Sequence, residues 1–140
     1  MNAKFFLDTN IIVHAFGQSF PEKARIAQRL VAGGAADKQA IISYQVVQEF
    51  INVALRGFRL TIPKADLESF VLTALFPMMA ISSSPSLVIE GLRLQGANQL
   101  AWYDSLIVAA ALQGGCKVLY SEDMQHGRRF GDLVIQNPFL

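Results

Sequence analysis

Short apolar runs alternate along this chain with longer stretches whose apolar residues recur at helical spacing. The runs are too short for buried helices and are bounded by glycine, proline or polar residues, which is typical of strands. Strands that alternate with helices favour an α/β domain built on a mainly parallel sheet. We expect strands at Lys4–Leu7, Ala40–Ser43, Met79–Ser82 and Lys117–Tyr120, and a last, edge strand at Asp132–Ile135.

Proline and glycine mark where the helices between these strands begin and end. Pro21, Pro63 and Pro85 suit the first turn or the start of a helix, and the pair Gly33-Gly34 and the residue Gly96 suit the end of one. These signals predict helices at Ile11–Phe16, Pro21–Val31, Tyr44–Leu55, Lys64–Leu75, Pro85–Leu94 and Trp102–Gln113.

Length and composition limit the classes of protein that this chain can represent. Its 140 residues suit one domain, 1–140. Hydrophobic residues make up 52% of the chain, yet no apolar run reaches the roughly 18 residues that span a membrane. With a single cysteine, Cys116, and no secretion signal, we expect a cytoplasmic protein without membrane contact. The excess of apolar residues favours a homodimer.

Four acidic residues interrupt this apolar chain at informative places. Asp8 and Asp123 follow predicted strands, whereas Glu49 and Asp104 lie within apolar helical stretches. Ligands of open α/β sheets bind beyond the carboxyl ends of the strands, so Asp8 and Asp123 are expected on one rim. Ionised carboxylates in apolar surroundings are costly unless they are paired or bind a cation. The pattern therefore predicts a site for Mg²⁺ or Mn²⁺, although it does not place Glu49 and Asp104 there.

The segments around these acids resemble those of PIN-domain ribonucleases, most closely the VapC-type toxins of type II toxin–antitoxin systems. The resemblance covers essentially the whole chain, and its motifs occur in the expected order. They are Leu7-Asp8-Thr9-Asn10, Gln48-Glu49-Phe50, the run from Trp102 to Ala111, Ser121-Glu122-Asp123-Met124 and Asn137-Pro138-Phe139.

The resemblance implies a PIN-like three-layer α/β/α domain in which the four acids meet in one catalytic pocket. Asp8 and Asp104 would bind Mg²⁺ or Mn²⁺ directly, and Glu49 and Asp123 would complete the metal site through water or a second ion. Whether Asp123 or its neighbour Glu122 faces the pocket stays open.

The same resemblance implies that Asn10 and Ser121 support the acids by hydrogen bonds. It also implies a metal-dependent endoribonuclease that is inhibited by a bound protein antitoxin. Since the net charge is only +1, RNA phosphates would have to bind local basic residues. Candidates are Arg56, Arg59 and Arg128, with Arg129 beside it, whereas Lys23 is less well placed.

Simpler interpretations exist for each residue. Asp8 is a suitable helix cap, Glu49 an ordinary solvated position and Asp123 a turn former. His14 is expected to be a packed or rim residue, and no cysteine or second histidine at ligand spacing supports zinc.

At the level of the whole protein, the alternative is a non-catalytic PIN-like RNA-binding or regulatory module. A phosphohydrolase that uses Asp8 as nucleophile, as haloacid-dehalogenase-like enzymes do, would need a second Asp at position 10, which is Asn.

Overall fold

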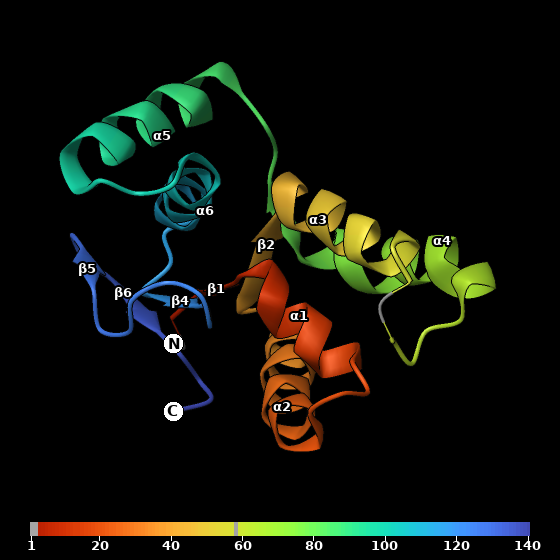
Figure 1. The fold of residues 1–140 in the computed structure, drawn as a ribbon. Helices are drawn as coiled ribbons and strands as arrows, with labels where there is room; N and C mark the ends of the chain where they lie inside the picture. The colour runs from red at the N-terminus through yellow and green to blue at the C-terminus, as the bar shows by residue number, and fades with distance from the viewer. Residues whose placement is uncertain (1–2, 58) are drawn as a thin grey trace.

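A computed structural model of the protein describes residues 3–57 and 59–140, and in these residues it contains a six-stranded sheet between helices (Figure 1). The strand order is β3-β2-β1-β4-β6-β5, and neighbouring strands are parallel except for the antiparallel pair β5–β6. The strands are β1 (Phe5–Leu7), β2 (Ala40–Ser43), β3 (Met79–Ile81), β4 (Val118–Tyr120), β5 (Arg129–Phe130) and β6 (Leu133–Gln136).

Helices connect these strands and cover the sheet. The segment between α3 and β3 is irregular and contains the short helix α4. The helices are α1 (Thr9–Phe16), α2 (Pro21–Asp37), α3 (Tyr44–Leu55), α4 (Leu67–Phe70), α5 (Pro85–Asn98) and α6 (Trp102–Gln113).

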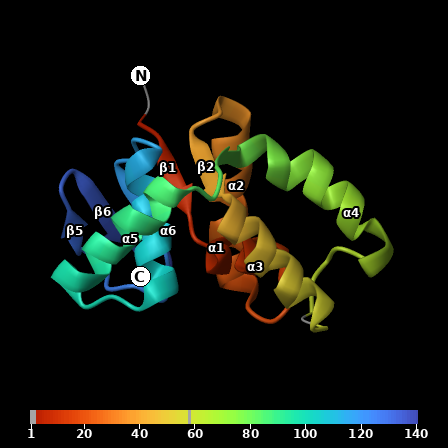
Figure 2. The same cartoon turned by 90° about the horizontal axis from the view of Figure 1, so that it is seen from above.

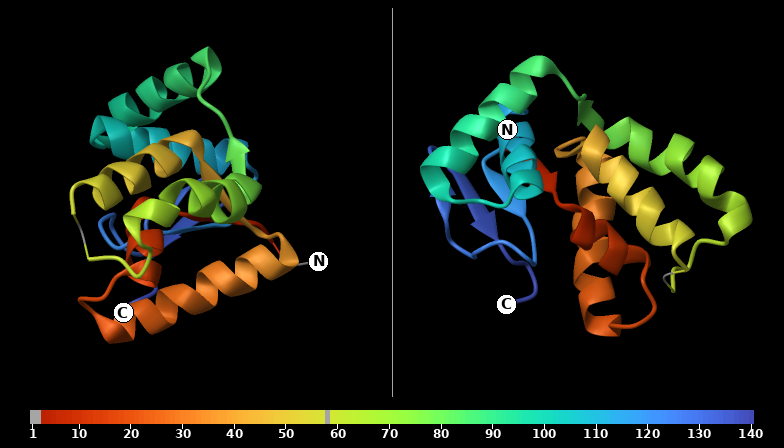
Figure 3. Two further views of the ribbon diagram at one scale, coloured as in Figure 1. Left: turned by 90° about the vertical axis from the view of Figure 1, so that its right-hand side faces the viewer. Right: turned by 45° about the horizontal axis from the view of Figure 1, so that its top comes forward.

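Two helical pairs lie on opposite sides of the sheet. Helix α1 packs on α2, and α5 packs on α6. Figures 1 and 3 show the sheet between α2 on one side and the α5–α6 pair on the other. Seen from above in Figure 2, α3 and α4 extend from the β2–β3 side of the sheet, away from β5. The predicted α/β/α class, with a mainly parallel central sheet, is confirmed.

Two glycine signals were misleading. Helix α2 continues through Gly33-Gly34 to Asp37 instead of ending at Val31, because Gly34 lets the helix approach the sheet. A Cβ atom at Gly34 would lie 2.3 Å from Ala40 Cβ and 2.7 Å from Phe5 Cζ. Lys38, the C-cap residue that follows Asp37, has a left-handed φ of 60° and terminates the helix. Likewise α5 continues past Gly96 to Asn98, and its C-cap residue Gln99 has a φ of 56°.

The predicted helix Lys64–Leu75 is not continuous. A 3₁₀ turn (Lys64–Asp66) precedes α4, and a π-helical turn (Val71–Leu75) and a second 3₁₀ turn (Phe76–Met78) follow it. Pro77 has no N–H to donate to the carbonyl of residue 73, so an α-helical ladder cannot extend through it. Phe76 N–H instead donates to the carbonyl of Val71, five residues earlier.

The last strand is not at the edge as predicted. The two-residue strand β5, which the sequence pattern did not reveal, pairs antiparallel with β6 and takes the edge position. The apolar faces of the strands and helices meet in a core whose largest fully buried side chains include Phe6, Ile12, Ile42, Phe50 and Leu119. None of the helices in the described residues is long and apolar enough to cross a membrane.

Candidate active site

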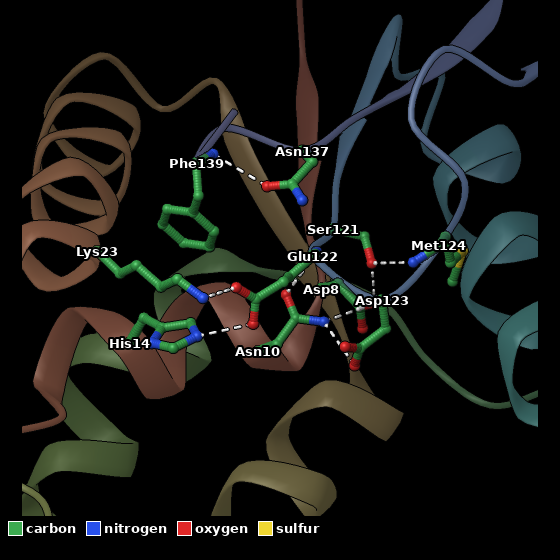
Figure 4. Close-up of polar contacts among 10 residues, drawn as sticks. All are labelled: Asp8, Asn10, His14, Lys23, Ser121, Glu122, Asp123, Met124, Asn137 and Phe139. Carbon is green, nitrogen blue, oxygen red and sulfur yellow. Dashed lines mark hydrogen bonds and ion pairs between the residues drawn. The ribbon is translucent and has the colours of Figure 1, made fainter. Parts of the chain in front are cut away.

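The parallel pairing of β1 with β4 determines where the acidic site lies. Leu7 is in register with Tyr120, and the Asp8 N–H continues the pairing by donating to the Tyr120 carbonyl at 3.0 Å. Asp8 and Ser121, the residues that follow these strands, are therefore neighbours on one rim of the sheet. The Ser121 hydroxyl donates to Asp8 Oδ2 at 2.8 Å (Figure 4).

Asp8 both caps α1 and contributes to this rim. Its Oδ1 accepts the Thr9 N–H at 2.8 Å, so the helix-cap interpretation is correct but incomplete. Burial raises the pKa of the Asp8 carboxyl to about 6, against the lowering effect of the hydrogen bonds from Ser121 and Thr9. This value includes smaller raising effects from the nearby charges of Glu49 and Asp104. A buried carboxylate in this field gains from a cation.

Asn10 connects the two ends of the rim. Its Nδ2 donates to Asp123 Oδ2 at 3.2 Å and lies 3.4 Å from Asp8 Oδ2. Its Oδ1 accepts the Glu122 N–H at 3.1 Å, which holds the loop after β4 against α1 (Figure 4). The amide thus separates two carboxylates that would otherwise repel each other.

Glu49 and Asp104 reach the same place from two helices. The Thr9 hydroxyl donates to Glu49 Oε1 at 2.7 Å, which joins α3 to the start of α1. Asp104 lies in the first turn of α6, where burial and then the charge of Asp123 raise the pKa of its carboxyl. The structure therefore brings the two helical acids beside the two strand-end acids.

All four carboxylates line one pocket of about 520 Å³. Its other lining residues come mainly from α1, the turn after it and α3. They include Thr9, Asn10, Val13, His14, Gly17, Phe20, Gln45, Asn52 and Val53.

Glu122 also lines this pocket, but its carboxylate is bound by the side chains of His14 and Lys23. Its Oε1 lies 2.9 Å from His14 Nε2, and its Oε2 forms an ion pair with Lys23. Although burial would raise the pKa of Glu122, its hydrogen bonds and ion pairs with Lys23 and His14 lower it overall. In Figure 4 Glu122 points toward His14 and Lys23, while Asp123 points toward Asn10 and Asp8.

The four arginines that we considered for RNA binding, Arg56, Arg59, Arg128 and Arg129, lie outside the pocket lining. Arg56 and Arg59 are exposed beyond the end of α3. Arg128 Nη2 donates to the Asn98 carbonyl at 2.7 Å, and its guanidinium lies 5.0 Å from the centre of the Phe130 ring. Arg128 thus holds the end of α5 against the loop before β5.

The chemistry of the donors suits a hard divalent cation. The four acids offer only carboxylate oxygens, which hard cations such as Mg²⁺ prefer as ligands. Mg²⁺ is usually bound through one or two carboxylates and keeps several waters. Among the described residues, no three His, Cys, Asp or Glu side chains are close enough together to form a complete metal cage. The arrangement therefore fits an ion held by few direct protein ligands, with the remaining acids acting through water.

Three residues of the site were not assigned to it from the sequence. Thr9 lies within the Leu7-Asp8-Thr9-Asn10 motif. His14 lies four residues after Asn10, so helical spacing places Asn10 and His14 on one face of α1. Lys23 offers no such signal, because its partner Glu122 is 99 residues away and only the packing of α2 brings them together.

Comparison with known proteins agrees with this architecture. The profile of the PIN domain family matches residues 5–129, so the chain belongs to the PIN domain family. No curated protein matches the sequence significantly.

Two solved structures share the fold. A chain in the structure of FitAB bound to an IR36 DNA fragment superposes with a TM-score of 0.67 and 18% identity, covering 97% of this chain and 96% of that one. Mycobacterium tuberculosis VapC20, described as a sarcin–ricin-loop-cleaving toxin, gives a TM-score of 0.61 and 15% identity, covering 86% of this chain and 90% of that one. At these identities the likeness concerns the fold.

Proposed function

We propose that this protein is a Mg²⁺- or Mn²⁺-dependent endoribonuclease and the toxin of a toxin–antitoxin pair. The observation that carries the proposal is the convergence of Asp8, Glu49, Asp104 and Asp123 on one pocket from four separate segments. Membership of the PIN domain family and the likeness in fold to VapC20, an RNA-cleaving toxin, support hydrolysis of RNA.

Each acid has a distinct part in this proposal. Asp8 and Asp104 hold the ion directly, and Glu49 and Asp123 complete the site through water. When bound, the ion supplies the charge that offsets the phosphodiester and lowers the pKa of its water. The chain itself orients the acids: Ser121 and the Thr9 N–H fix Asp8, the Thr9 hydroxyl fixes Glu49, and Asn10 fixes Asp123.

Substrate contacts lie outside the acidic centre. Arg56 and Arg59 are exposed after α3, which begins at the sheet and lines the pocket with Gln45, Glu49 and Asn52. We assign these two arginines to RNA phosphates flanking the cleaved bond. Arg128 remains a candidate only if RNA displaces its guanidinium from the Asn98 carbonyl.

Exposed apolar surface supports the proposal that this protein binds protein partners. Leu72 and Phe76, with Ile51 of α3, line an open apolar groove of about 320 Å³ between α3 and the segment that contains α4. We propose that an antitoxin peptide covers this region and presents a basic side chain to the acidic pocket. A homodimer would cover further apolar surface, for which α5 offers Val88, Ile89 and Leu92.

The test is cleavage of single-stranded and structured RNA with Mg²⁺, Mn²⁺ or EDTA. Asp8→Asn and Asp104→Asn should each lower the rate by about 1000-fold or more, since charge stabilisation by the ion is worth several kcal/mol in the transition state. Glu122→Gln is the matched control, because its carboxylate is already bound by Lys23 and His14. Unchanged cleavage and growth inhibition in both aspartate variants would refute the proposal.

The alternative function is a non-catalytic RNA-binding module of the same fold. The absence of a complete three-ligand cage among the described residues favours it. The negative charge gathered in the pocket argues against it, because bare carboxylates repel phosphates. RNA binding that neither needs a metal nor leads to cleavage would establish this alternative.

A further inference from the structure

An uncharged hollow lies beside the acidic pocket, between the first turns of α3 and α6 and the start of α5. Its volume is about 190 Å³, below the range of about 300–1,000 Å³ found for drug-sized ligands. Its lining, within the residues that the structure describes, consists only of serine, tyrosine, glutamine and aliphatic side chains. The hollow therefore suits a small neutral group and offers no charge to a phosphate.

Two tyrosines and several aliphatic side chains line this hollow. Leu87 is buried, and Ile81 and Leu106, which also line the hollow, are half-buried. Tyr44 and Tyr103 line the same hollow but are 42% and 65% exposed. Large aromatic side chains that stay this exposed present flat apolar surface to the solvent. Such a surface is suited to stacking against another flat ring.

The hollow adjoins the acidic pocket through two residues. Gln45 lines both, and its Nε2 donates to the Tyr103 carbonyl at 3.2 Å, which ties the first turn of α3 to that of α6. Tyr103 directly precedes Asp104. Figure 1 shows the first turn of α3 nearer to α6 than its last turn is. The hollow and the acidic pocket are therefore adjacent, so that neighbouring parts of one bound molecule could occupy both.

We propose that this hollow binds an unpaired nucleobase of the RNA whose phosphate lies at the acidic pocket, with Tyr44 and Tyr103 stacking on it. The inference rests on the proposed ribonuclease function and adds a subsite to it. Proteins recognise single-stranded RNA by stacking splayed bases on aromatic rings and by hydrogen-bonding the base edges. Here Gln45 and Gln48 are among the lining residues, and their amides can hydrogen-bond a base edge.

Binding to a non-cleaving protein separates stacking from chemistry. In an Asp8→Asn background, we would measure the Kd of a short single-stranded RNA and of a set of oligonucleotides that each carry one abasic position. Tyr44→Ala and Tyr103→Ala should each weaken binding of the intact RNA roughly 5- to 100-fold. Tyr44→Phe and Tyr103→Phe keep the ring and should bind nearly as the parent does.

The abasic series identifies the base that stacks. At one position, loss of the base should weaken binding to the parent protein but no longer to the tyrosine-to-alanine variants. Leu140→Ala is the matched control, because Leu140 is an exposed hydrophobic residue (85%) that lies outside the lining of the hollow. It should leave the Kd unchanged. Melting temperatures within a few degrees of the parent would exclude a general loss of folding.

Three outcomes would overturn the inference. The first is an unchanged Kd in both alanine variants while the wild type still cleaves RNA with Mg²⁺, which leaves the ribonuclease function intact. The second is an equal loss on every abasic oligonucleotide. The third is dissociation of a dimer by Tyr103→Ala, which would make the hollow part of an interface between two copies. If the wild type neither cleaves nor binds RNA, the proposed function fails and the subsite fails with it.

Discussion

Two groups of acids share one pocket and differ in how their charge is compensated. Glu122 has its own partners, His14 from α1 and the cation Lys23 from α2. Asp8, Glu49, Asp104 and Asp123 accept hydrogen bonds from neutral groups at most, and within the described residues no ion pair involves them. The difference supports the proposed metal site, because these four acids lack a cationic partner in the described part of the fold, whereas Glu122 is paired with Lys23.

The pKa directions sharpen this comparison, because they predict opposite dependences of stability on pH. Asp8 has a raised pKa in the folded protein, so its contribution to the free energy of unfolding is greatest below its ordinary value of 3.8. That contribution is lost as the pH rises to about 6. Glu122 has a lowered pKa, so its contribution is present above 4.5 and is lost as the pH falls below this value.

The largest effect is expected from Asp8 in the metal-free protein. Between pH 4 and pH 6.5, ionisation of Asp8 should lower the free energy of unfolding by about 2 kcal/mol. Asp8→Asn should remove this part of the pH dependence. The measurement is urea unfolding in EDTA across this range, comparing wild type with variant. Parallel pH profiles for the two proteins would contradict the account of Asp8 as an uncompensated acid.

The next effect is stabilisation by metal. At a concentration about 100 times its Kd, Mn²⁺ or Mg²⁺ should stabilise the wild type by about 2.7 kcal/mol. This corresponds to a rise in melting temperature of roughly 5–10 °C. Asp8→Asn and Asp104→Asn should abolish most of it, whereas Glu122→Gln should retain it. Thermal unfolding with and without the ion measures this, and equal shifts in all four proteins would erase the distinction between the two groups of acids.

The smallest effect concerns the compensated acid. Lys23→Met keeps an apolar stem near Phe20 and Phe139 but removes the charge that faces Glu122. Because the pair is partly exposed, the cost should be about 1 kcal/mol near pH 7 and smaller below pH 4. Urea unfolding at both pH values tests it, with Lys38→Met, an exposed lysine at the end of α2, as control.

The strand-end part of the site could be predicted from the sequence. Asp8 and Asp123 follow apolar strands, and parallel strands of one sheet end at the same rim, so their proximity depends only on the fold class. Glu49 and Asp104 needed the family resemblance, because a helical position does not reveal which way the helix faces. The apolar pattern of α6 is too uniform to show this, since six of its residues are buried.

Glycine shows the same limit for the fold. Gly34 looks like a helix end in the sequence, because glycine is disfavoured within helices and common after them. Its reason lies on another element: Ala40 and Phe5 occupy the space that a side chain would need. In the sequence, a glycine that ends a helix cannot be distinguished from a glycine that lets a helix pack closely on a sheet.

By itself, the sequence determined the alternation of strands and helices, the parallel sheet and the acids that follow its strands. These properties follow from local periodicity and from the polarity of parallel strands. Only the tertiary structure shows how the surroundings of Glu122 and Asp123 differ. The two are adjacent in the chain, and Lys23 and His14 draw one carboxylate to themselves while Asn10 holds the other at the rim. His14 and Lys23 lie about a hundred residues away in the sequence, and only the packing of α1 and α2 brings their side chains to Glu122.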